Sequence, residues 1–483
     1  MTRIIIGPFN RVEGDLEVKL DIADGSVREA HVVSTLYRGF ERILRGKKPS
    51  DALIYAPRIC GICSVSQSVA AAGALAAAGG SVPPANGALA INTIHATENI
   101  ADHLTHFYLF FMPDFARAAY AREPWHEAVA DRFTAIKGTA TGDMLPARAQ
   151  FMHIMGILAG KWPHTLSVQP GGTTRSISRG EVARLSAILA GFRAFLERRL
   201  FGDSLERISA LRNADELQAW ADERRPESSD FRLFLHVSRA IRLEKLGRAC
   251  DRFMSYGAYA RADAALFPAG VWSDGNVAPL VLDHVTEDLS HAWYESRATV
   301  ERPFDGTTVA DASRGDAYSW CKAPRLGGAV VEVGAIARQQ IAGHPLVRDL
   351  VHAGGGNVHS RVVARLLEIA RVTQAMEDWI RRIDPGDTFC VHDRLPDQCV
   401  GIGTTEAARG SLGHWLSVRN GQIDNYQIVA PTTWNFSPRD ASGTPGALEQ
   451  ALVGAPVGAG ESEPVSVQHI VRSFDPCLVC TVH

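Results

Sequence analysis

The chain has 483 residues, 46% of them hydrophobic and 21% charged, so it is long enough to bury a large core. Its 50 basic and 53 acidic residues give a formal net charge of -3, and it has neither a Lys/Arg block suited to a nucleic-acid backbone nor an apolar run of the ~20 residues that a membrane-spanning helix needs. Eight scattered cysteines are too few for a secreted disulfide scaffold, and the start MTRIIIGPFN lacks a signal-peptide layout, so we expect a protein of a reducing compartment without its own export signal.

The first predicted element is a β-hairpin. Residues 16–22 alternate apolar and charged side chains, Asp24-Gly25 favours a turn, and a second apolar stretch covers 27–33. Because alternation over such short lengths is typical of a strand with one buried face, we expect a small antiparallel sheet near the start of the chain.

The middle of the chain is predicted to be helical. Apolar residues recur three and four positions apart, the spacing of an amphipathic helix, over 86–112, 178–200, 231–264 and 358–383. Asn420-Gly421 then separates two alternating stretches and predicts a hairpin with a type I′ turn. We therefore expect an α+β protein, mainly α, with central long helices, small antiparallel hairpins near both termini and a single domain over 1–483.

Two Cys-x-x-Cys pairs stand almost at opposite ends of the chain, Cys60 and Cys63 in RICGIC and Cys477 and Cys480 in DPCLVCTVH. Thiolates three residues apart on a tight turn can point at one centre, and two such pairs make a four-sulfur set. Such a set selects zinc, copper(I), nickel or iron over magnesium or calcium. A structural zinc site is one interpretation; the large separation of the pairs and their apolar flanks favour a dry, buried centre instead.

Three charged residues stand in apolar or glycine-rich surroundings and need a partner or a function: Glu13 in RVEGD, Arg409 in EAARGSLGHW, and Asp475 directly before Pro476. The remaining cysteines, at 250, 321, 390 and 399, have no paired spacing of this kind. We interpret them as inert thiols and assign them no role.

Taken together, these motifs resemble the large subunit of nickel-iron hydrogenases. The resemblance covers nearly the whole chain, and the motifs occur in the family's order. In addition to the two cysteine motifs, they are RVEGD (11–15), RGFE (38–41), ADHLTHFY (101–108), PGGTTR (170–175), YSWCKAPR (318–325), EAARGSLGHW (406–415) and PTTWN (431–435).

The resemblance implies a large-subunit fold with a nickel-iron centre, in which the iron carries one carbon monoxide and two cyanides. Cys60 and Cys477 would be terminal nickel ligands, and Cys63 and Cys480 would bridge nickel to iron. The implied reaction is the heterolytic activation of H2, which requires a hydride acceptor, a base for the proton and a route by which the proton leaves.

The resemblance also assigns roles around the centre. Glu13 resembles the proton-relay glutamate that exchanges a proton with Cys477; the alternative is a solvated loop carboxylate. Arg409 resembles the arginine over the open metal position; the alternative is an ordinary salt-bridged arginine, with Asp102 and Asp475 as partners, and both can hold together.

Two further features follow the family's pattern around the iron and at a second metal. Thr432 resembles the residue that hydrogen-bonds an iron cyanide, helped by the backbone around Ala408. The family usually has proline at this position, and alanine lacks the ring that restrains the backbone there. A magnesium site is implied at Glu41, His483 and a backbone carbonyl at Ile428; a surface glutamate and a frayed terminal histidine are the alternative.

Two departures indicate a branch of the family. Gln67 stands where the family usually has histidine, and the chain stops at His483, where most precursors continue. Both features resemble the cytoplasmic regulatory branch, which senses H2 and signals to a histidine kinase. The alternative is a membrane-linked uptake hydrogenase at the periplasmic face, exported with its small subunit.

An iron-sulfur small subunit is expected in either case, because this chain offers no further cysteine set for such clusters. A protein of another class also shares the ancestry: the hydrogenase-like subunit of quinone-reducing complexes, which has lost the nickel cysteines. The presence of all four cysteines argues against that interpretation.

Overall fold

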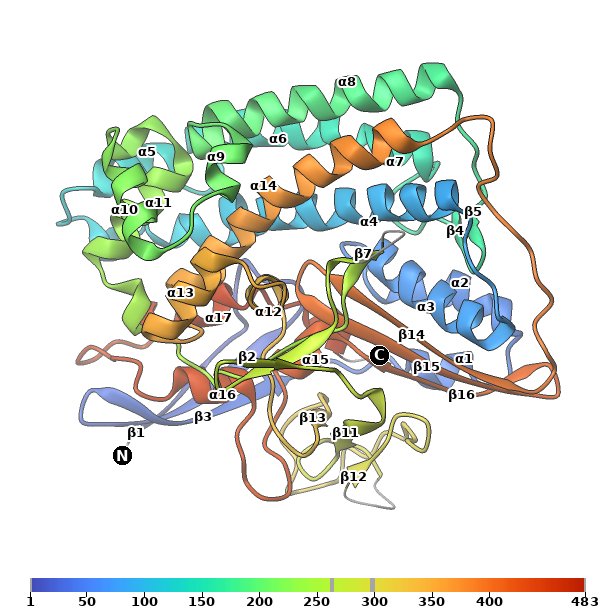
Figure 1. Cartoon of the computed structure of the whole chain (residues 1–483). Helices are drawn as coiled ribbons and strands as arrows, with labels where there is room; N and C mark the ends of the chain where they lie inside the picture. The colour runs from blue at the N-terminus through green and yellow to red at the C-terminus, as the bar shows by residue number, and fades with distance from the viewer. Residues whose placement is uncertain (1, 261–264, 296–299, 482–483) are drawn as a thin grey trace.

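The computed structural model describes residues 2–260, 265–295 and 300–481. Long helices form a layer along one side, and small sheets lie beneath it (Figure 1). The central pair of the helical layer is α4 (Ala85–Thr105) and α14 (Val358–Arg382). Helix α8 (Arg179–Phe195) packs on α14, and α6 (Thr139–Phe151) packs on α8. This is the α+β, mainly helical architecture predicted from the sequence.

The starts of the long helices follow from local chemistry. α14 begins after Asn357, whose side chain accepts from the Ser360 amide while the Ser360 hydroxyl accepts from the Asn357 amide. α8 begins after Ser178 with the same reciprocal pair, completed by Glu181. The predictions for 86–112, 178–200 and 358–383 are confirmed; the first two helices each end in a π-helical turn, His106–Phe111 and Leu196–Phe201.

The prediction of one helix over 231–264 is wrong beyond its first third. Helix α11 covers Asp230–Ala240, and short strands β6 (Phe253–Ser255) and β7 (Ala258–Ala260) follow; residues 261–264 lie outside the described part. The apolar spacing continues past 240, but Gly247 and Gly257 have positive φ angles of 78° and 84°, which a helix cannot contain. Backbone conformation therefore overrides the side-chain pattern there.

Antiparallel sheets lie near both ends of the chain. Strand β2 (Leu16–Ala23) pairs with β3 (Ser26–Ser34), as predicted, and also with β1 (Thr2–Ile6), whose continuous isoleucine run gave no alternation to detect. The second sheet has the order β14 (Cys399–Ala407), β15 (Gly410–Arg419), β16 (Gln422–Val429). Asn420 and Gly421 turn between the last two strands with φ angles of 53° and 70°, as a type I′ turn requires.

Helix α3 (Ser64–Gly79) lies directly on strand β14. A Cβ atom at Gly403 would stand 1.9 Å from the Ala70 carbonyl oxygen, and one at Gly401 would stand 2.1 Å from that of Ala74. Only glycine permits backbone contact this close. The contact sets the height of α3 above the sheet, and with it the place of the Cys60–Cys63 loop that leads into the helix.

The other elements connect these layers. The remaining helices are α1 (Phe40–Leu44), α2 (Ala52–Tyr55), α5 (His126–Phe133), α7 (His153–Leu158), α9 (Leu205–Ser209), α10 (Ala214–Asp222), α12 (Ala335–Ile341), α13 (Pro345–Gly354), α15 (Pro431–Asn435), α16 (Ala447–Leu452), α17 (Val465–Ser473) and α18 (Leu478–Thr481). The remaining strands are β4 (Val168–Gln169), β5 (Gly172–Thr173), β8 (Ala265–Phe267), β9 (Gly270–Ser273), β10 (Asn276–Ala278), β11 (Val285–Asp288), β12 (Val300–Glu301) and β13 (Ala323–Leu326). In the described ranges, no helix combines the length and apolar character needed to cross a membrane.

Candidate metal centre

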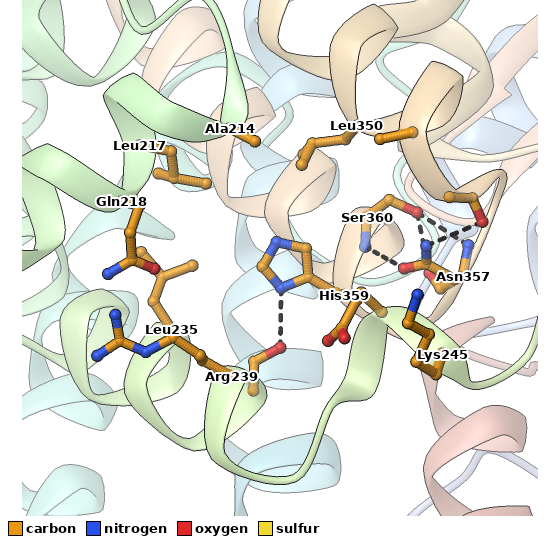
Figure 2. Close-up of a pocket in the computed structure, with 14 residues that line it drawn as sticks. Ala214, Leu217, Gln218, Leu235, Arg239, Lys245, Leu350, Asn357, His359 and Ser360 are labelled. Atoms are coloured by element: carbon orange, nitrogen blue, oxygen red, sulfur yellow. Dashed lines mark hydrogen bonds between the residues drawn. The ribbon is translucent and has the colours of Figure 1, made fainter.

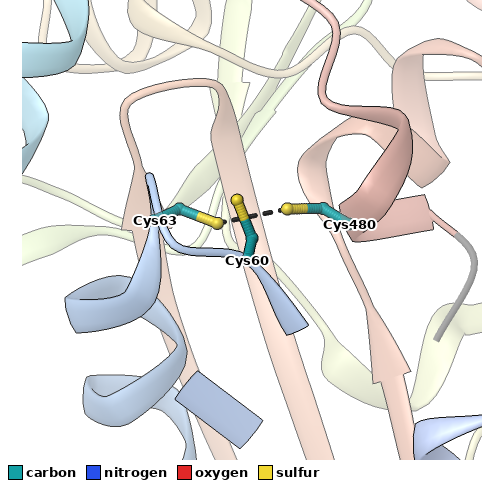
Figure 3. Close-up of side chains that lie close together, drawn as sticks. All are labelled: Cys60, Cys63 and Cys480. Atoms are coloured by element: carbon teal, nitrogen blue, oxygen red, sulfur yellow. Dashed lines mark hydrogen bonds between the residues drawn. The ribbon is translucent and has the colours of Figure 1, made fainter. Parts of the chain in front are cut away.

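The two cysteine pairs meet in one buried cage. The loop before α3 contributes Cys60 and Cys63, and α18 contributes Cys480 (Figure 3). Cys477 directly precedes α18. The Sγ atoms of Cys60 and Cys477 lie 3.5 Å apart, those of Cys63 and Cys480 3.1 Å, and those of Cys477 and Cys480 3.0 Å. All four side chains are at most 6% exposed.

The charge state of the sulfurs fits a soft metal. Hydrogen bonds from the thiols of Cys477, Cys480 and Cys63 lower the pKa of Cys60 well below its usual range. Burial raises the pKa of Cys477, so this thiol holds its proton more firmly than Cys60 does. A bound metal cation would take the place of such thiol protons. A dry set of four convergent thiolates is the donor chemistry that nickel and iron accept, and the same set also suits zinc.

Arg38, to which sequence reasoning assigned no role, links the two cysteine segments. Its Nη2 donates to the carbonyl oxygen of Ile59, just before Cys60, and to that of Val479, just before Cys480. The RGFE motif was the available signal, but spacing alone does not say which carbonyls a guanidinium reaches. One cation therefore fixes the mutual placement of segments from both ends of the chain.

Glu13 is held against the second cysteine pair by its backbone. Its amide donates to the Pro476 carbonyl at 3.4 Å, and its carbonyl accepts from the Leu478 amide at 2.7 Å, which makes a parallel bridge between Glu13 and Cys477. Burial raises the pKa of the half-buried Glu13 carboxyl, and the negative charge of Cys60 raises it further. The backbone thus holds residue 13 beside Cys477, and the charge of the cage acts on the Glu13 carboxyl.

Arg409 makes the salt bridges that the sequence offered as an alternative to a role over the metal. It is buried and donates to both carboxylate oxygens of Asp102 and, at 3.1 Å, to Oδ1 of Asp475. Its pKa is raised by these two carboxylates and then by Cys477 and Cys60, which outweigh the effect of burial. The guanidinium therefore lies within the electrostatic reach of the cage and remains charged.

The wall beside Cys477 contains the residues expected around an iron. The Thr432 hydroxyl oxygen accepts from the Cys477 amide at 3.1 Å, which leaves its own O–H to donate elsewhere. Ala408 stands where the resemblance led us to expect a proline. The buried guanidinium of Arg338 donates to the carbonyl oxygens of Ala407 and Ala408 at 2.9 Å and 3.0 Å. Hydrogen bonds thus restrain the wall in place of a proline ring.

Glu41 lies in a buried, oxygen-rich cluster. Its Oε1 accepts from the Ile428 amide at 2.7 Å, and its Oε2 accepts from Lys322 Nζ at 3.2 Å. Lys322 also donates to Glu287 at 3.3 Å and to Gln427 Oε1 at 2.7 Å. Burial raises the pKa of Glu287 to about 7, and the oxygens of this cluster are the kind of donor that a hard cation prefers. His483 lies outside the described residues, so its expected place in this site stays a prediction.

Gln67 lies in a buried hydrogen-bonded chain. Tyr426 donates to His414 Nδ1 at 2.7 Å, and His414 Nε2 donates to Gln67 Oε1 at 2.8 Å. Within the described part of the chain, the Gln67 amide nitrogen has no partner. A carboxamide neither gains nor loses a proton near neutral pH, so the Gln67 side chain cannot relay protons as a histidine could.

A separate cavity of about 340 Å³ lies between α10, α11, α13 and α14 (Figure 2). His359 points into it and is hydrogen-bonded at 2.8 Å to Ser238, and Leu217 and Leu350 supply apolar lining. The lining, drawn from the described residues, contains none of the four cage cysteines. We assign this cavity no part in the metal centre.

A family model described as nickel-dependent hydrogenase matches residues 38–135 and 233–483 of this chain. Among curated proteins, the chain is 29% identical over 517 residues to the periplasmic [NiFeSe] hydrogenase large subunit of Desulfomicrobium baculatum, covering 100% of this chain and 95% of that protein. It is 28% identical over 576 residues to the hydrogenase-2 large chain of Escherichia coli, covering 100% and 97%.

Among solved structures, the Ni-Fe-Se hydrogenase from D. vulgaris Hildenborough in the reduced state superposes with a TM-score of 0.83 at 29% identity, with 100% of both chains covered. The fold, the cage and these matches agree. The chain therefore belongs to the nickel-dependent hydrogenase family, as a large subunit with hydrogenase activity.

Proposed function

We propose that this chain activates H2 heterolytically at a nickel-iron group held by Cys60, Cys63, Cys477 and Cys480. The carrying observation is the convergence of these four buried sulfurs from opposite ends of the chain, beside Glu13 and Arg409. When bound, the group supplies the electron-accepting site at which H2 is split. Cys60 and Cys477 are the proposed terminal nickel ligands, and Cys63 and Cys480 the proposed bridges to iron.

The chain's own residues handle the proton. The sulfur of Cys477 accepts it, and Glu13, bridged to Cys477 through the backbone, takes it over and passes it toward solvent. Arg409 holds a fixed positive charge near the sulfurs, and Asp102 and Asp475 keep its guanidinium in one orientation. The raised pKa of Glu13 supports this role, because a relay must bind the proton as well as release it.

The proposal extends to the iron ligands and to a second metal. One carbon monoxide and two cyanides on the iron would lie against Thr432 and the backbone at Ala408, where the Thr432 O–H could donate to a cyanide. Magnesium would be held by Glu41, the Ile428 carbonyl and His483, and the neighbouring oxygens of Glu287 and Gln427 could bind its retained waters.

Electrons need a path away from the cage, so we propose a small subunit carrying iron-sulfur clusters as the partner. The relatives described above are named large subunits or large chains, which supports an assembly of at least two different chains.

Metal analysis and infrared spectroscopy of the purified protein test the core of the proposal. We expect about one nickel and one iron per chain and bands from carbon monoxide and cyanide. Replacement of Cys477 by serine should abolish H2 activation, because a hard hydroxyl replaces a soft thiolate. Zinc alone in the wild-type protein would refute the proposal.

For the physiological role we propose a cytoplasmic H2 sensor that signals to a histidine kinase. The supporting observation is Gln67, whose side chain ends a hydrogen-bonded chain in a group that cannot titrate. The alternative is membrane-linked uptake of H2 for respiration at the periplasmic face, favoured by relatives named as periplasmic and uptake enzymes. Deleting the gene separates the two: hydrogenase genes that still respond to H2 would exclude the sensor role.

A further inference from the structure

Cys63 stands in the position where a helix normally carries its own cap. It immediately precedes α3, and a Ser, Thr, Asp or Asn there would accept hydrogen bonds from the second and third helical amides. Cys63 makes no such side-chain bond, and its sulfur lies 3.1 Å from that of Cys480. Because the cage uses this side chain, the first turn of α3 needs a cap from elsewhere.

Glu98 of α4 supplies that cap. Its carboxylate accepts from the amides of Val65 and Ser66, the second and third residues of α3, at 2.8 Å and 2.9 Å. The hydroxyls of Ser64 and Ser66 donate to it at 3.2 Å and 3.1 Å, and Trp162 Nε1 donates at 2.9 Å. Five donors thus converge on one side chain that is 2% exposed.

This arrangement places negative charge under the cysteine loop. The five donors and the positive N-terminal end of α3 favour the ionised form of this carboxyl group. Burial raises the pKa of Glu98, the hydrogen bonds from Val65, Ser66 and Trp162 lower it, and the charge of Cys60 raises it; together these effects give a pKa of about 7. Glu98 and Cys60 therefore interact electrostatically without touching.

The segment that carries Trp162 holds the other side of the same loop. The His164 amide donates to the Ser64 hydroxyl at 3.2 Å, and its Nδ1 bonds the Pro57 carbonyl at 2.9 Å. This segment falls between the ranges 38–135 and 233–483 that match the family model. Glu98 thus joins a part of the chain outside that match to the metal-binding loop.

We propose that Glu98 is a positioning residue of the metal centre, which caps α3 in place of Cys63 and sets the orientation and electrostatic potential of the Cys60–Cys63 loop. It acts through the loop, as Glu98 bonds to the first turn of α3 and to Trp162. The inference rests on the proposed nickel-iron function, which it deepens.

Glu98→Gln in the complete enzyme, produced with its small subunit, tests the charge. This variant keeps the shape, removes the charge and turns one acceptor into a donor. We expect nickel and iron to be retained and the infrared bands of carbon monoxide and cyanide to move to higher wavenumber, because less electron density reaches the iron through the thiolates. Bands identical to those of the wild type would overturn the proposal.

Glu449→Gln is the matched control. Glu449 is also buried and accepts from the Val32 amide at 3.0 Å, the Tyr318 hydroxyl at 2.8 Å and the Gly446 amide at 3.2 Å, between β3 and α16. Removing the charge of Glu449 should lower the free energy of unfolding and leave the infrared bands unchanged. A band shift of equal size in this variant would show that general loosening, and not the position of Glu98, explains the effect.

A second readout needs no metal. Amide hydrogen exchange in the first turn of α3 should be faster in Glu98→Gln than in the wild type, and unchanged exchange would overturn the capping role. If Glu98→Gln does not accumulate, Glu98→Asp keeps the charge but withdraws it by one methylene group; displaced or broadened bands support the proposal, and unchanged bands contradict it. Wild-type protein without nickel or these bands would instead refute the proposed function, while the exchange experiment still tests the cap.

Discussion

At the scale of single residues, Glu13 is the sharpest test of proton transfer. Glu13→Gln keeps the backbone bridge to Cys477 but cannot carry a proton, so we expect exchange between H2 and D2O to fall by about 100-fold or more with nickel and iron retained. Asp15, two residues on and exposed, provides the matched variant Asp15→Asn, which should exchange at the wild-type rate. Undiminished exchange in Glu13→Gln would exclude Glu13 as the relay.

Arg38 tests how the two cysteine segments are held. Arg38→Lys keeps the positive charge but offers one ammonium instead of a planar guanidinium, so it cannot hold the carbonyls of Ile59 and Val479 in the same geometry. We expect nickel content after purification to fall several-fold. Arg45→Lys is the control, because Arg45 is exposed and its side chain donates to the Asp424 carbonyl, away from the cysteine segments. Equal nickel content in both variants would contradict a linking role for Arg38.

The residue scale also shows what sequence could and could not predict about the site. The two Cys-x-x-Cys pairs were visible because close spacing on one turn directs two sulfurs to one point. Arg38 and Glu98 were not, because the contacts that define their roles are to backbone carbonyls and amides, which every residue carries. Recognising them requires knowledge of which segments the fold brings together.

At the scale of elements, the contact between α3 and β14 depends on missing side chains. In Gly403→Ala the new methyl group would meet the Ala70 carbonyl oxygen at 1.9 Å and the Ala74 amide at 2.3 Å, so helix and strand must separate. We expect a loss of about 3 kcal/mol in unfolding free energy, measured by urea denaturation. Gly191→Ala in α8, where nothing lies within 4 Å, should instead stabilise by about 0.5–1 kcal/mol. Equal stability of Gly403→Ala and wild type would show that the layers can move apart without cost.

The long helices and both terminal hairpins were predictable because burial of one face imposes a period on the sequence. Strand β1 has three isoleucines in a row although Ile5 is 58% exposed, so its sequence shows no alternation between a buried and an exposed face. Beyond Ala240 the period persisted although glycines bent the backbone, so a pattern of apolar residues alone overstated the helix. The ends of helices and strands therefore depend on backbone conformation, which the spacing of apolar residues does not predict.

At the scale of the whole molecule, Asp114 joins the two ends of the chain. Its carboxylate accepts from Arg11 near the start of the chain. Both of its oxygens also accept from Arg472 Nη1 in α17, at 2.9 Å and 2.7 Å, and Oδ2 lies 3.3 Å from His469 Nδ1. Burial raises the pKa of Asp114, but the hydrogen bond from His469 and the charges of Arg472 and Arg11 outweigh it and lower the pKa well below its usual value. The ionised group therefore stabilises the native state above the unfolded-state pKa of about 3.9.

Asp114→Asn should cost about 3–5 kcal/mol at neutral pH, because buried cations lose their partner. The difference from wild type should persist from pH 8 to about pH 5 and shrink as the pH falls through the pKa of the folded wild-type protein. Thermal unfolding across this range checks both statements. Asp24→Asn, which breaks an exposed 2.8 Å pair with Arg28, should change stability by less than about 1 kcal/mol. A gap that stays constant at low pH would contradict the assignment of the effect to the charge of Asp114.

The distance along the chain between the two cysteine pairs also fixes an order of events during synthesis. Cys60 and Cys477 are 417 residues apart, and at about 5–20 residues per second the second pair emerges roughly 20–80 seconds after the first. During that interval the first pair is a set of thiols without its partners. Metal that requires all four ligands can be retained only after translation has passed the last cysteine, so any factor that delivers it earlier must itself replace the absent sulfurs.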